Sequence, residues 1–344
     1  MPTTRLEDDT MQPHHPTPPE AAAADARCVP DTGGAPLPAR VTIVEVGPRD
    51  GLQNEAAFVA TATKVGLIER LLEAGARHVE AASFVSPKWV PQMADGAQVL
   101  AGVANAAGRD RAVLSALVPN LRGLEAALAA RCDEVAVFAA ASEGFSQANI
   151  HCGIAESLAR FVPVIEQARQ AGVPVRGYVS CVLGCPYEGE VAPAQVAAVA
   201  GELYRMGCRE ISLGDTVGRG TPLATRRMLD ACAREVPLAA LAGHFHDTWG
   251  MAVANVFAAL QAGVTVFDAS VSGIGGCPYS PGATGNLASE DLVYLCDGLG
   301  IDTGIDLGRL VAAGEFISAA LGRPGVSRAA RAWRARQATA TACA

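Results

Sequence analysis

Two histidines separated by a single residue are the residues of this sequence best suited to chemistry. Residues 243–247 read GHFHD, so His244 and His246 flank Phe245. In an extended strand, side chains two positions apart point to the same face, so the two imidazoles would lie side by side while Phe245 packs the other way. This spacing suits a metal site, although an isolated pair is more often two hydrogen-bonded histidines. The position of the pair in the fold decides between these roles.

Charged residues also lie directly after one apolar segment and within another. Arg49 and Asp50 follow an apolar run that ends at Val46, and Glu80 lies within the apolar run 78–82. An Arg-Asp neighbour pair is most often a surface ion pair. At the end of a buried strand, however, Asp50 can offer a hard oxygen ligand and Arg49 can stabilise a developing oxyanion. A carboxylate among apolar residues is rarely left unpaired, so we expect Arg49 to be the partner of Glu80.

A segment rich in glycine and proline, residues 272–286, is expected to be a loop that closes over a ligand rather than a plain connection. It contains Cys277, a candidate proton donor or nucleophile. The same tetrapeptide, GCPY, occurs around Cys185, and spacing does not separate the two. Asn286 either caps the helix that follows or supplies its amide oxygen as a metal ligand. Asp215, after another apolar run, would bind substrate or fix a neighbouring group.

The elements that must position these residues alternate regularly from Val41 onward. Eight runs are expected to be strands: 41–46, 78–82, 112–118, 134–139, 174–182, 209–213, 239–246 and 265–272. Segments of helical period lie between them, and several end in the glycine that a left-handed C-cap requires. Eight such units predict a (β/α)8 TIM barrel over residues 39–300, with its catalytic groups at the C-terminal ends of the strands. A doubly wound open sheet is the alternative, but the phosphate-binding G-x-G-x-x-G is missing after the first strand.

Composition and the flanking segments narrow the class of protein. The 344 residues are 50% hydrophobic and carry a net charge of −8, which gives no basic field for nucleic acid or an anionic membrane. No apolar stretch reaches about 18 residues, so we expect a soluble protein without a membrane span. Ten irregularly spaced cysteines predict reduced thiols and a cytoplasmic location. Residues 1–38 should be a disordered leader without a targeting signal, residues 301–322 a helical cap and residues 323–344 a loose tail.

Together these residues suggest one type of reaction. Four side chains would give a mixed nitrogen and oxygen site suited to Mg or Mn: Asp50, His244, His246 and Asn286. Such a metal acidifies a substrate alcohol, and loss of the alcohol proton lets an adjacent C–C bond break when the resulting enolate is stabilised. Arg49 is placed for the enolate oxygen, and the Cys277 thiol would protonate the enolate carbon. The sequence therefore predicts a metal-assisted retro-aldol or Claisen cleavage, or its reverse.

At this point three long motifs are recognisable: VEVGPRDGLQNE at 44–55, SFVSPKWVPQM at 83–93 and the Cys277 loop. From Val41 to Leu321 the chain resembles the 3-hydroxy-3-methylglutaryl-CoA lyases of the DRE-TIM metallolyase superfamily. The resemblance implies cleavage of this acyl-CoA substrate to acetyl-CoA and acetoacetate with Mg or Mn, in leucine and ketone-body metabolism. It further implies a homodimer in the cytoplasm.

The resemblance also assigns roles to individual residues. The family's metal ligands match Asp50, His244, His246 and Asn286. Its catalytic arginine and supporting glutamate match Arg49 and Glu80, and its active-site aspartate matches Asp215. Its loop cysteine matches Cys277 rather than Cys185, and its loop glutamate, assigned to substrate binding, matches Glu290.

Three rival functions share parts of this pattern. A transferase of the same superfamily would condense acetyl-CoA with a 2-oxo acid, but the Cys277 loop favours the lyase. A lyase for a longer branched substrate, such as 3-hydroxy-3-isohexenylglutaryl-CoA, would share every catalytic residue and differ in its pocket. A non-catalytic binding protein on a decayed barrel is disfavoured by the intact ligand set.

Overall fold

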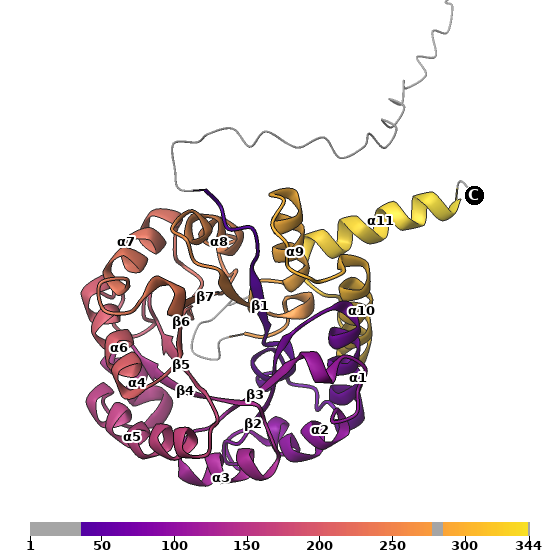
Figure 1. Ribbon diagram of the computed structural model, residues 1–344. Coiled ribbons are helices and arrows are strands. Elements are labelled where there is room, and N and C mark those ends of the chain that lie inside the picture. Colours follow the sequence, from indigo (N-terminus) through magenta and orange to yellow (C-terminus); the bar gives the residue numbers. More distant parts are fainter. Residues whose placement is uncertain (1–35, 277–284, 343–344) are drawn as a thin grey trace, which may run out of the picture. The chain divides into compact units, whose positions relative to one another are not determined.

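The computed structural model describes residues 36–276 and 285–342, and the eight expected strands close into a parallel barrel (Figure 1). The strands pair in chain order, and β8 returns to pair with β1. Their bounds are β1 Thr42–Glu45, β2 His78–Ser83, β3 Val113–Leu117, β4 Glu134–Ala140, β5 Val175–Ser180, β6 Glu210–Asp215, β7 Leu241–Phe245 and β8 Val266–Ala269. The predicted TIM barrel is confirmed, and the doubly wound sheet is wrong.

Helices surround the strands on the outside of the barrel (Figure 1). Those between strands are α1 Thr61–Ala74, α2 Gly96–Gly102, α3 Leu121–Ala129, α4 Glu143–Ile150, α5 Ile154–Gln170, α6 Pro193–Met206, α7 Pro222–Cys232 and α8 Ala252–Gln261. After β8 come α9 Ser289–Gly298, α10 Leu307–Leu321 and α11 Arg328–Ala342. Within the described part of the chain, no helix is both long enough and apolar enough to span a membrane.

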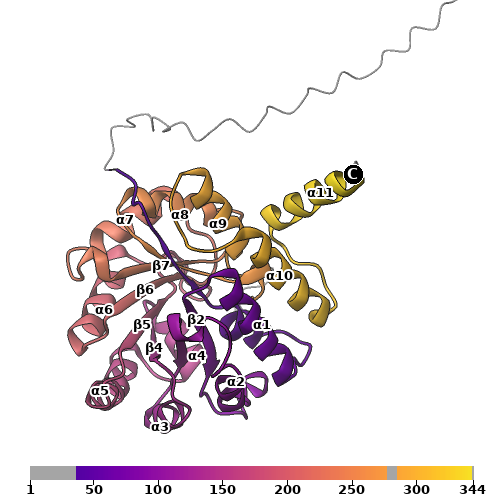
Figure 2. The same cartoon turned by 45° about the vertical axis from the view of Figure 1, so that its right-hand side comes forward.

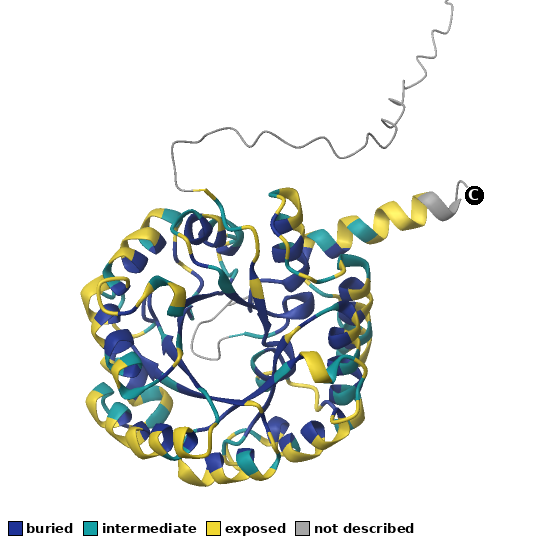
Figure 3. Cartoon of the chain, viewed as in Figure 1, coloured by how far each residue is buried: buried dark blue, intermediate teal, exposed yellow. Residues whose placement is uncertain are grey.

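The main core fills the layer between strands and helices, where Figure 3 shows the buried faces. In α1, Leu67, Ile68 and Leu71 are fully buried, because their helical spacing places them on one face. Both α1 and α6 end at a glycine in the left-handed conformation, Gly75 with φ 108° and Gly207 with φ 112°. This conformation is costly for a residue with a Cβ, so each glycine ends its helix and turns the chain into the next strand.

The C-terminal region differs in part from its prediction. The expected helical cap forms α10, which packs against α1 (Figure 2). The segment predicted as a loose tail contains α11, whose sequence is rich in the strong helix formers alanine and arginine. Asp291 of α9 caps its start by accepting hydrogen bonds from the Ser327 hydroxyl and the Ala329 amide, both at 2.7 Å. The boundaries at residues 300 and 322 stay predictions.

Two further predictions concern the leader and the thiols. Residues 1–35, which make up most of the predicted leader, lie outside the described residues. The described part of the chain contains seven cysteines, and none of them forms a disulfide. All seven are buried.

Candidate active site

A short π-helical turn, η1 (Gly47–Gly51), places Arg49 and Asp50 directly after β1. A Cβ at Gly51 would lie only 2.7 Å from Ile274 and 2.8 Å from Ser270, so only glycine lets this turn pack against the segment that follows β8. Arg49 is buried. The C-terminal ends of all eight parallel strands meet at this end of the barrel, which we call the mouth.

Arg49 joins two carboxylates at the mouth. Its Nε and Nη2 lie 2.6 Å from Oε2 of Glu80, and its Nη1 lies 2.6 Å from Oδ1 of Asp50. Burial would lower the pKa of Arg49, but the charges of Glu80 and Asp50 outweigh it and the pKa rises, so the guanidinium stays positive. The expected pairing of Arg49 with Glu80 is therefore confirmed. The other oxygen of Glu80, Oε1, is buried without a hydrogen-bond partner.

His244 and His246 face Asp50 at the same mouth. One ligand atom from each of the three residues lies within 4.8 Å of the others, and the two imidazole centroids are 5.3 Å apart. Phe245 between them belongs to the hydrophobic core, as its alternate position in the strand requires. The predicted same-face arrangement of the histidines is thus confirmed. Among the described residues, Cys181 and Cys185 belong to no such group of possible metal ligands.

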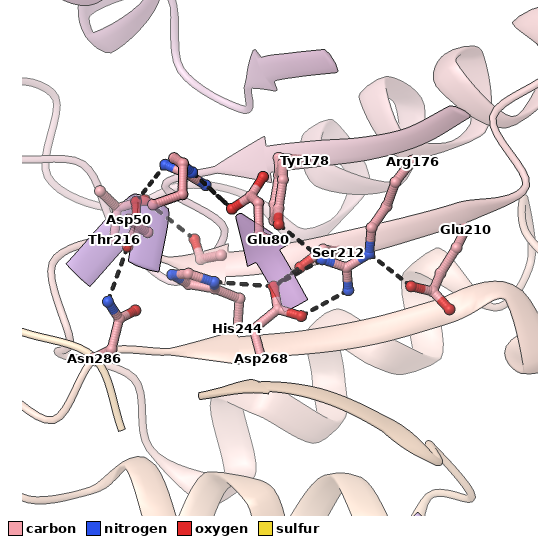
Figure 4. A network of polar contacts seen from close by, with 12 residues as sticks. Asp50, Glu80, Arg176, Tyr178, Glu210, Ser212, Thr216, His244, Asp268 and Asn286 are labelled. Carbon is pink, nitrogen blue, oxygen red and sulfur yellow. Dashed lines mark hydrogen bonds and ion pairs between the residues drawn. The ribbon is translucent and has the colours of Figure 1, made fainter. Parts of the chain in front are cut away.

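Asn286 completes this group. Its Nδ2 donates to Oδ2 of Asp50 at 2.9 Å (Figure 4). Its backbone forms an isolated β-bridge with His246. Helix α9 begins only at Ser289, with Ala288 as its N-cap, so the alternative that Asn286 caps this helix is wrong. Because the Asn286 amide nitrogen is used by Asp50, its amide oxygen is the atom left for a ligand.

The charge state of Asp50 follows from these contacts. Burial alone would raise its pKa, but the electrostatic interactions with Arg49, His244 and His246 and the hydrogen bond from Asn286 outweigh burial and lower the pKa to about 2. Asp50 is therefore a carboxylate at neutral pH and can act as a hard oxygen ligand.

The pKa values of the two histidines are shifted in opposite directions. Burial and the nearby His244 lower the pKa of His246 to about 4, so its imidazole is neutral at pH 7. Burial also lowers the pKa of His244, but the hydrogen bond and charge of Asp268, followed by the charge of Asp50, outweigh it and raise the pKa. This contrast comes from Asp268, whose Oδ2 lies 3.0 Å from Nδ1 of His244.

The donor set fits a divalent metal ion. His246 Nδ1 is a buried nitrogen with no hydrogen-bond partner, and a neutral imidazole with an unused lone pair is a metal donor. The Asp50 carboxylate, the second imidazole and the Asn286 amide oxygen add donors of mixed hardness. Such a set suits Mg, Mn or a similar ion better than a metal that prefers thiolates.

Asp215 and Glu290, also assigned by resemblance, both accept hydrogen bonds from backbone amides. Asp215 accepts hydrogen bonds from the amides of Gly218 at 3.1 Å and Gly220 at 2.8 Å, so it holds the loop after β6. Both oxygens of Glu290 accept from the Ser272 amide, at 3.0 and 2.9 Å, and burial raises the pKa of Glu290 to about 8. The catalytic role of Asp215 and the substrate-binding role of Glu290 stay predictions, and Cys277 lies outside the described residues.

Sequence reasoning missed a buried polar network inside the barrel. Arg176 of β5 forms two hydrogen bonds with Asp268 of β8, at 2.7 and 3.1 Å (Figure 4). Its Nη1 also donates to Tyr178 at 2.9 Å, and its Nε donates to Glu210 at 2.6 Å. Both Arg176 and Asp268 interrupt apolar strands, which is the same signal that drew attention to Glu80.

Comparison with known proteins agrees with this fold and site. Residues 40–317 match the family described as HMGL-like. The chain is 60% identical to the 3-hydroxy-3-isohexenylglutaryl-CoA/hydroxy-methylglutaryl-CoA lyase of Pseudomonas aeruginosa, over 86% of this chain and 98% of that protein. It is 58% identical to the hydroxymethylglutaryl-CoA lyase of Pseudomonas mevalonii, over 87% and 98%.

Solved structures give the same result. The crystal structure of hydroxymethylglutaryl-CoA lyase from Pseudomonas aeruginosa superposes with a TM-score of 0.85 at 59% identity, covering 87% of this chain and 99% of that one. An HMG-CoA lyase from Acinetobacter baumannii, solved with coenzyme A and 3-methylmalate, gives 0.80 at 36% identity, with 85% and 95% covered.

The fold and the site define an enzyme of the TIM-barrel metallolyase class. The chain belongs to the HMGL-like family, the hydroxymethylglutaryl-CoA lyases of the DRE-TIM superfamily, and is a carbon–carbon lyase.

Proposed function

We propose that this chain cleaves (S)-3-hydroxy-3-methylglutaryl-CoA to acetyl-CoA and acetoacetate, using a Mg or Mn ion held by four residues: Asp50, His244, His246 and Asn286. The observation that supports this most directly is the group of ligand atoms from Asp50 and the two histidines, within 4.8 Å of one another beside the buried Arg49. The high identity to lyases of this substrate supports the same reaction.

The net reaction breaks the C2–C3 bond and moves the proton of the C3 hydroxyl to C2. Removal of the proton from the C3 hydroxyl turns C3 into the ketone of acetoacetate, and the electrons of the C2–C3 bond pass to the thioester as an enolate. A divalent ion at this site lowers the pKa of the substrate hydroxyl when it is bound. Protonation of the enolate carbon then gives acetyl-CoA.

The chain's own residues favour this sequence through charge and position. Arg49, fixed by Glu80 and Asp50, presents a permanent positive charge at the mouth, where it stabilises the enolate oxygen. Asp50 is ionised and His246 neutral at pH 7, the states in which both donate to a metal. We assign the protonation of the enolate carbon to the Cys277 thiol, on the resemblance of its loop to the family.

Binding of an acyl-CoA is supported by the complex of the Acinetobacter baumannii enzyme with coenzyme A and 3-methylmalate. The buried carboxylates Asp215 and Glu290 would act here by holding the β6 loop and the segment after β8, respectively. We further propose a cytoplasmic homodimer that serves leucine degradation, as the resemblance to the family implies.

A second substrate is favoured by one finding. The Pseudomonas aeruginosa relative, at 60% identity, is named for both the isohexenyl and the methyl substrate. A longer branched acyl-CoA would undergo the same cleavage with the same residues, because the chemistry involves only C2, C3 and the hydroxyl. The acetyl-CoA and 2-oxo acid transferase has no such support among these relatives.

The test is a coupled assay of acetoacetate formation from hydroxymethylglutaryl-CoA after chelation and after return of Mg or Mn. We expect no turnover with chelator and full turnover with either the Mg or the Mn ion restored. Activity that persists after complete metal removal contradicts the metal mechanism. If only 3-hydroxy-3-isohexenylglutaryl-CoA is cleaved, the longer acyl-CoA is the substrate. If CoA is released from acetyl-CoA and a 2-oxo acid, the result supports the transferase instead.

A further inference from the structure

We propose that Asp268 is a positioning residue that fixes His244 in the orientation and tautomer needed to bind the metal ion, an inference that rests on the proposed metal site. Oδ2 of Asp268 lies 3.0 Å from Nδ1 of His244. A hydrogen bond at Nδ1 places the ring proton there and leaves the lone pair on Nε2, the nitrogen then available at the mouth.

Asp268 is itself held on every side within the barrel. Oδ1 accepts from Nη2 of Arg176 at 2.7 Å, and Oδ2 accepts from Nη1 of Arg176 at 3.1 Å and from the Ser212 hydroxyl at 2.7 Å (Figure 4). Its side chain is fully buried, with 0% exposure. A bidentate contact with a planar guanidinium fixes the plane of the carboxylate, so the direction of the acceptor toward His244 is fixed as well.

The backbone brings the pair together without any loop. His244 of β7 and Asp268 of β8 are register partners in the parallel sheet. Tyr178 packs an edge against the His244 ring, with centroids 6.1 Å apart. The imidazole is thus limited both by a hydrogen bond and by packing, whereas the buried Nδ1 of His246 has no hydrogen-bond partner. One of the two imidazole donors is therefore oriented in advance by a carboxylate.

A purely stabilising role explains this arrangement less well. A buried ion pair such as Arg176 with Asp268 gains little net stability, because removing both charges from water costs about as much as their attraction returns. The carboxylate of Asp268, however, also directs Oδ2 at His244, a proposed metal ligand. In metal sites, removal of such a carboxylate typically lowers metal affinity by about 10 to 100-fold.

The test is the affinity of the purified protein for Mn alone, measured from the electron paramagnetic resonance signal of free Mn without substrate. We expect Asp268→Asn to lower this affinity by about 10 to 100-fold. Asp268→Glu keeps the charge opposite Arg176 but moves the acceptor by one methylene, so it should lose affinity in the same direction with a smaller fall in Tm. This second variant tests the proposal if Asp268→Asn does not fold.

Asp95→Asn is the matched control. Asp95 forms an ion pair at 2.7 Å with the buried Lys64, between α1 and α2, so the same substitution removes a carboxylate from a buried cation outside the barrel interior. It should lower Tm while leaving Mn affinity within twofold of the unmodified chain.

A double-mutant comparison shows whether Asp268 acts through His244. If it does, Asp268→Asn added to His244→Ala lowers Mn affinity by less than twofold, because the residue that it orients is already gone. The proposal is overturned if Asp268→Asn and Asp268→Glu both bind Mn as the unmodified chain does, or if Asp95→Asn weakens binding equally. Failure of the unmodified chain to bind Mn refutes the metal site itself.

Discussion

Two groups of histidine, carboxylate and arginine in the barrel differ in which of their atoms lack a partner. The mouth cluster is made of Arg49, Asp50, Glu80, His244 and His246. The floor cluster is made of His78 and Glu134, the first residues of β2 and β4, with Arg209 just before β6. In the floor cluster, Oε1 of Glu134 lies 2.8 Å from Nε2 of His78, and Oε2 lies 2.5 Å from Nε of Arg209.

The mouth cluster is not closed in this way. Oε1 of Glu80 and Nδ1 of His246 are buried and lack hydrogen-bond partners. Oε2 of Glu134 in the floor cluster also lacks a hydrogen bond, but it faces the Arg209 guanidinium in an ion pair. The pKa values follow the same division. Burial raises the pKa of both glutamates, but the hydrogen bond and charge of His78 together with Arg209 outweigh it at Glu134, whose pKa is lowered, whereas Glu80 keeps a raised pKa. These contacts favour a stabilising role for the floor cluster and support the role proposed above for the mouth cluster.

The largest expected effect comes from removing one histidine from each cluster. His246→Ala takes away a proposed metal donor, so Mn affinity should fall by more than the roughly 100-fold upper range seen for residues that only orient a ligand. His78→Ala should lower Tm, because Glu134 loses one of its two partners and retains only Arg209. It should leave Mn affinity unchanged, because His78 is not a proposed metal ligand. Titration of free Mn by electron paramagnetic resonance, with thermal unfolding in parallel, measures both. Equal losses of affinity would remove the functional difference between the clusters.

The corresponding arginines give the next effect. Arg49→Gln should lower kcat by about 100-fold or more, the scale for loss of a group that stabilises an oxyanion, while Mn still binds. Arg209→Gln should change kcat by less than about twofold, since half of its side chain is exposed at the floor. Steady-state kinetics with saturating Mn checks the pair. A mild loss for Arg49→Gln would mean that the enolate is stabilised without this guanidinium.

The smallest effect is on the pH dependence of stability, and its sign is opposite in the two clusters. The lowered pKa of Glu134 contributes stability above about pH 4.5 that is lost as pH falls, so Glu134→Gln should remove part of the acid destabilisation. The raised pKa of Glu80 contributes stability that is present below about pH 4.5 and lost as pH rises, so Glu80→Gln should flatten the decline above that pH.

Urea unfolding from pH 3 to 8 with chelator present measures these slopes. One proton changes the free energy of unfolding by at most about 1.4 kcal/mol per pH unit. Changes of the same sign in Glu134→Gln and Glu80→Gln would show that the two carboxylates do not differ in the folded protein as their contacts imply.

The sequence by itself determined the features that depend on local order along the chain. Strand and helix periods are local, so all eight strands and the barrel were predicted within a few residues of their observed bounds. The alternation of side chains in a strand places His244 and His246 together and buries Phe245. Because parallel strands in a closed barrel end at one mouth, Asp50 could also be expected beside them, and the structure brings the three together.

Only the tertiary structure decided which distant residues meet. Arg176 and Asp268 are 92 positions apart, and their contact depends on the register and closure of eight strands, which no local pattern encodes. The tertiary structure likewise decides that Asp268 faces His244. It also decides that loop amides donate to Asp215 and that the Ser272 amide donates to Glu290. Sequence types and spacing identify the groups capable of chemistry, whereas three-dimensional packing determines which of them are already satisfied and which are left to act.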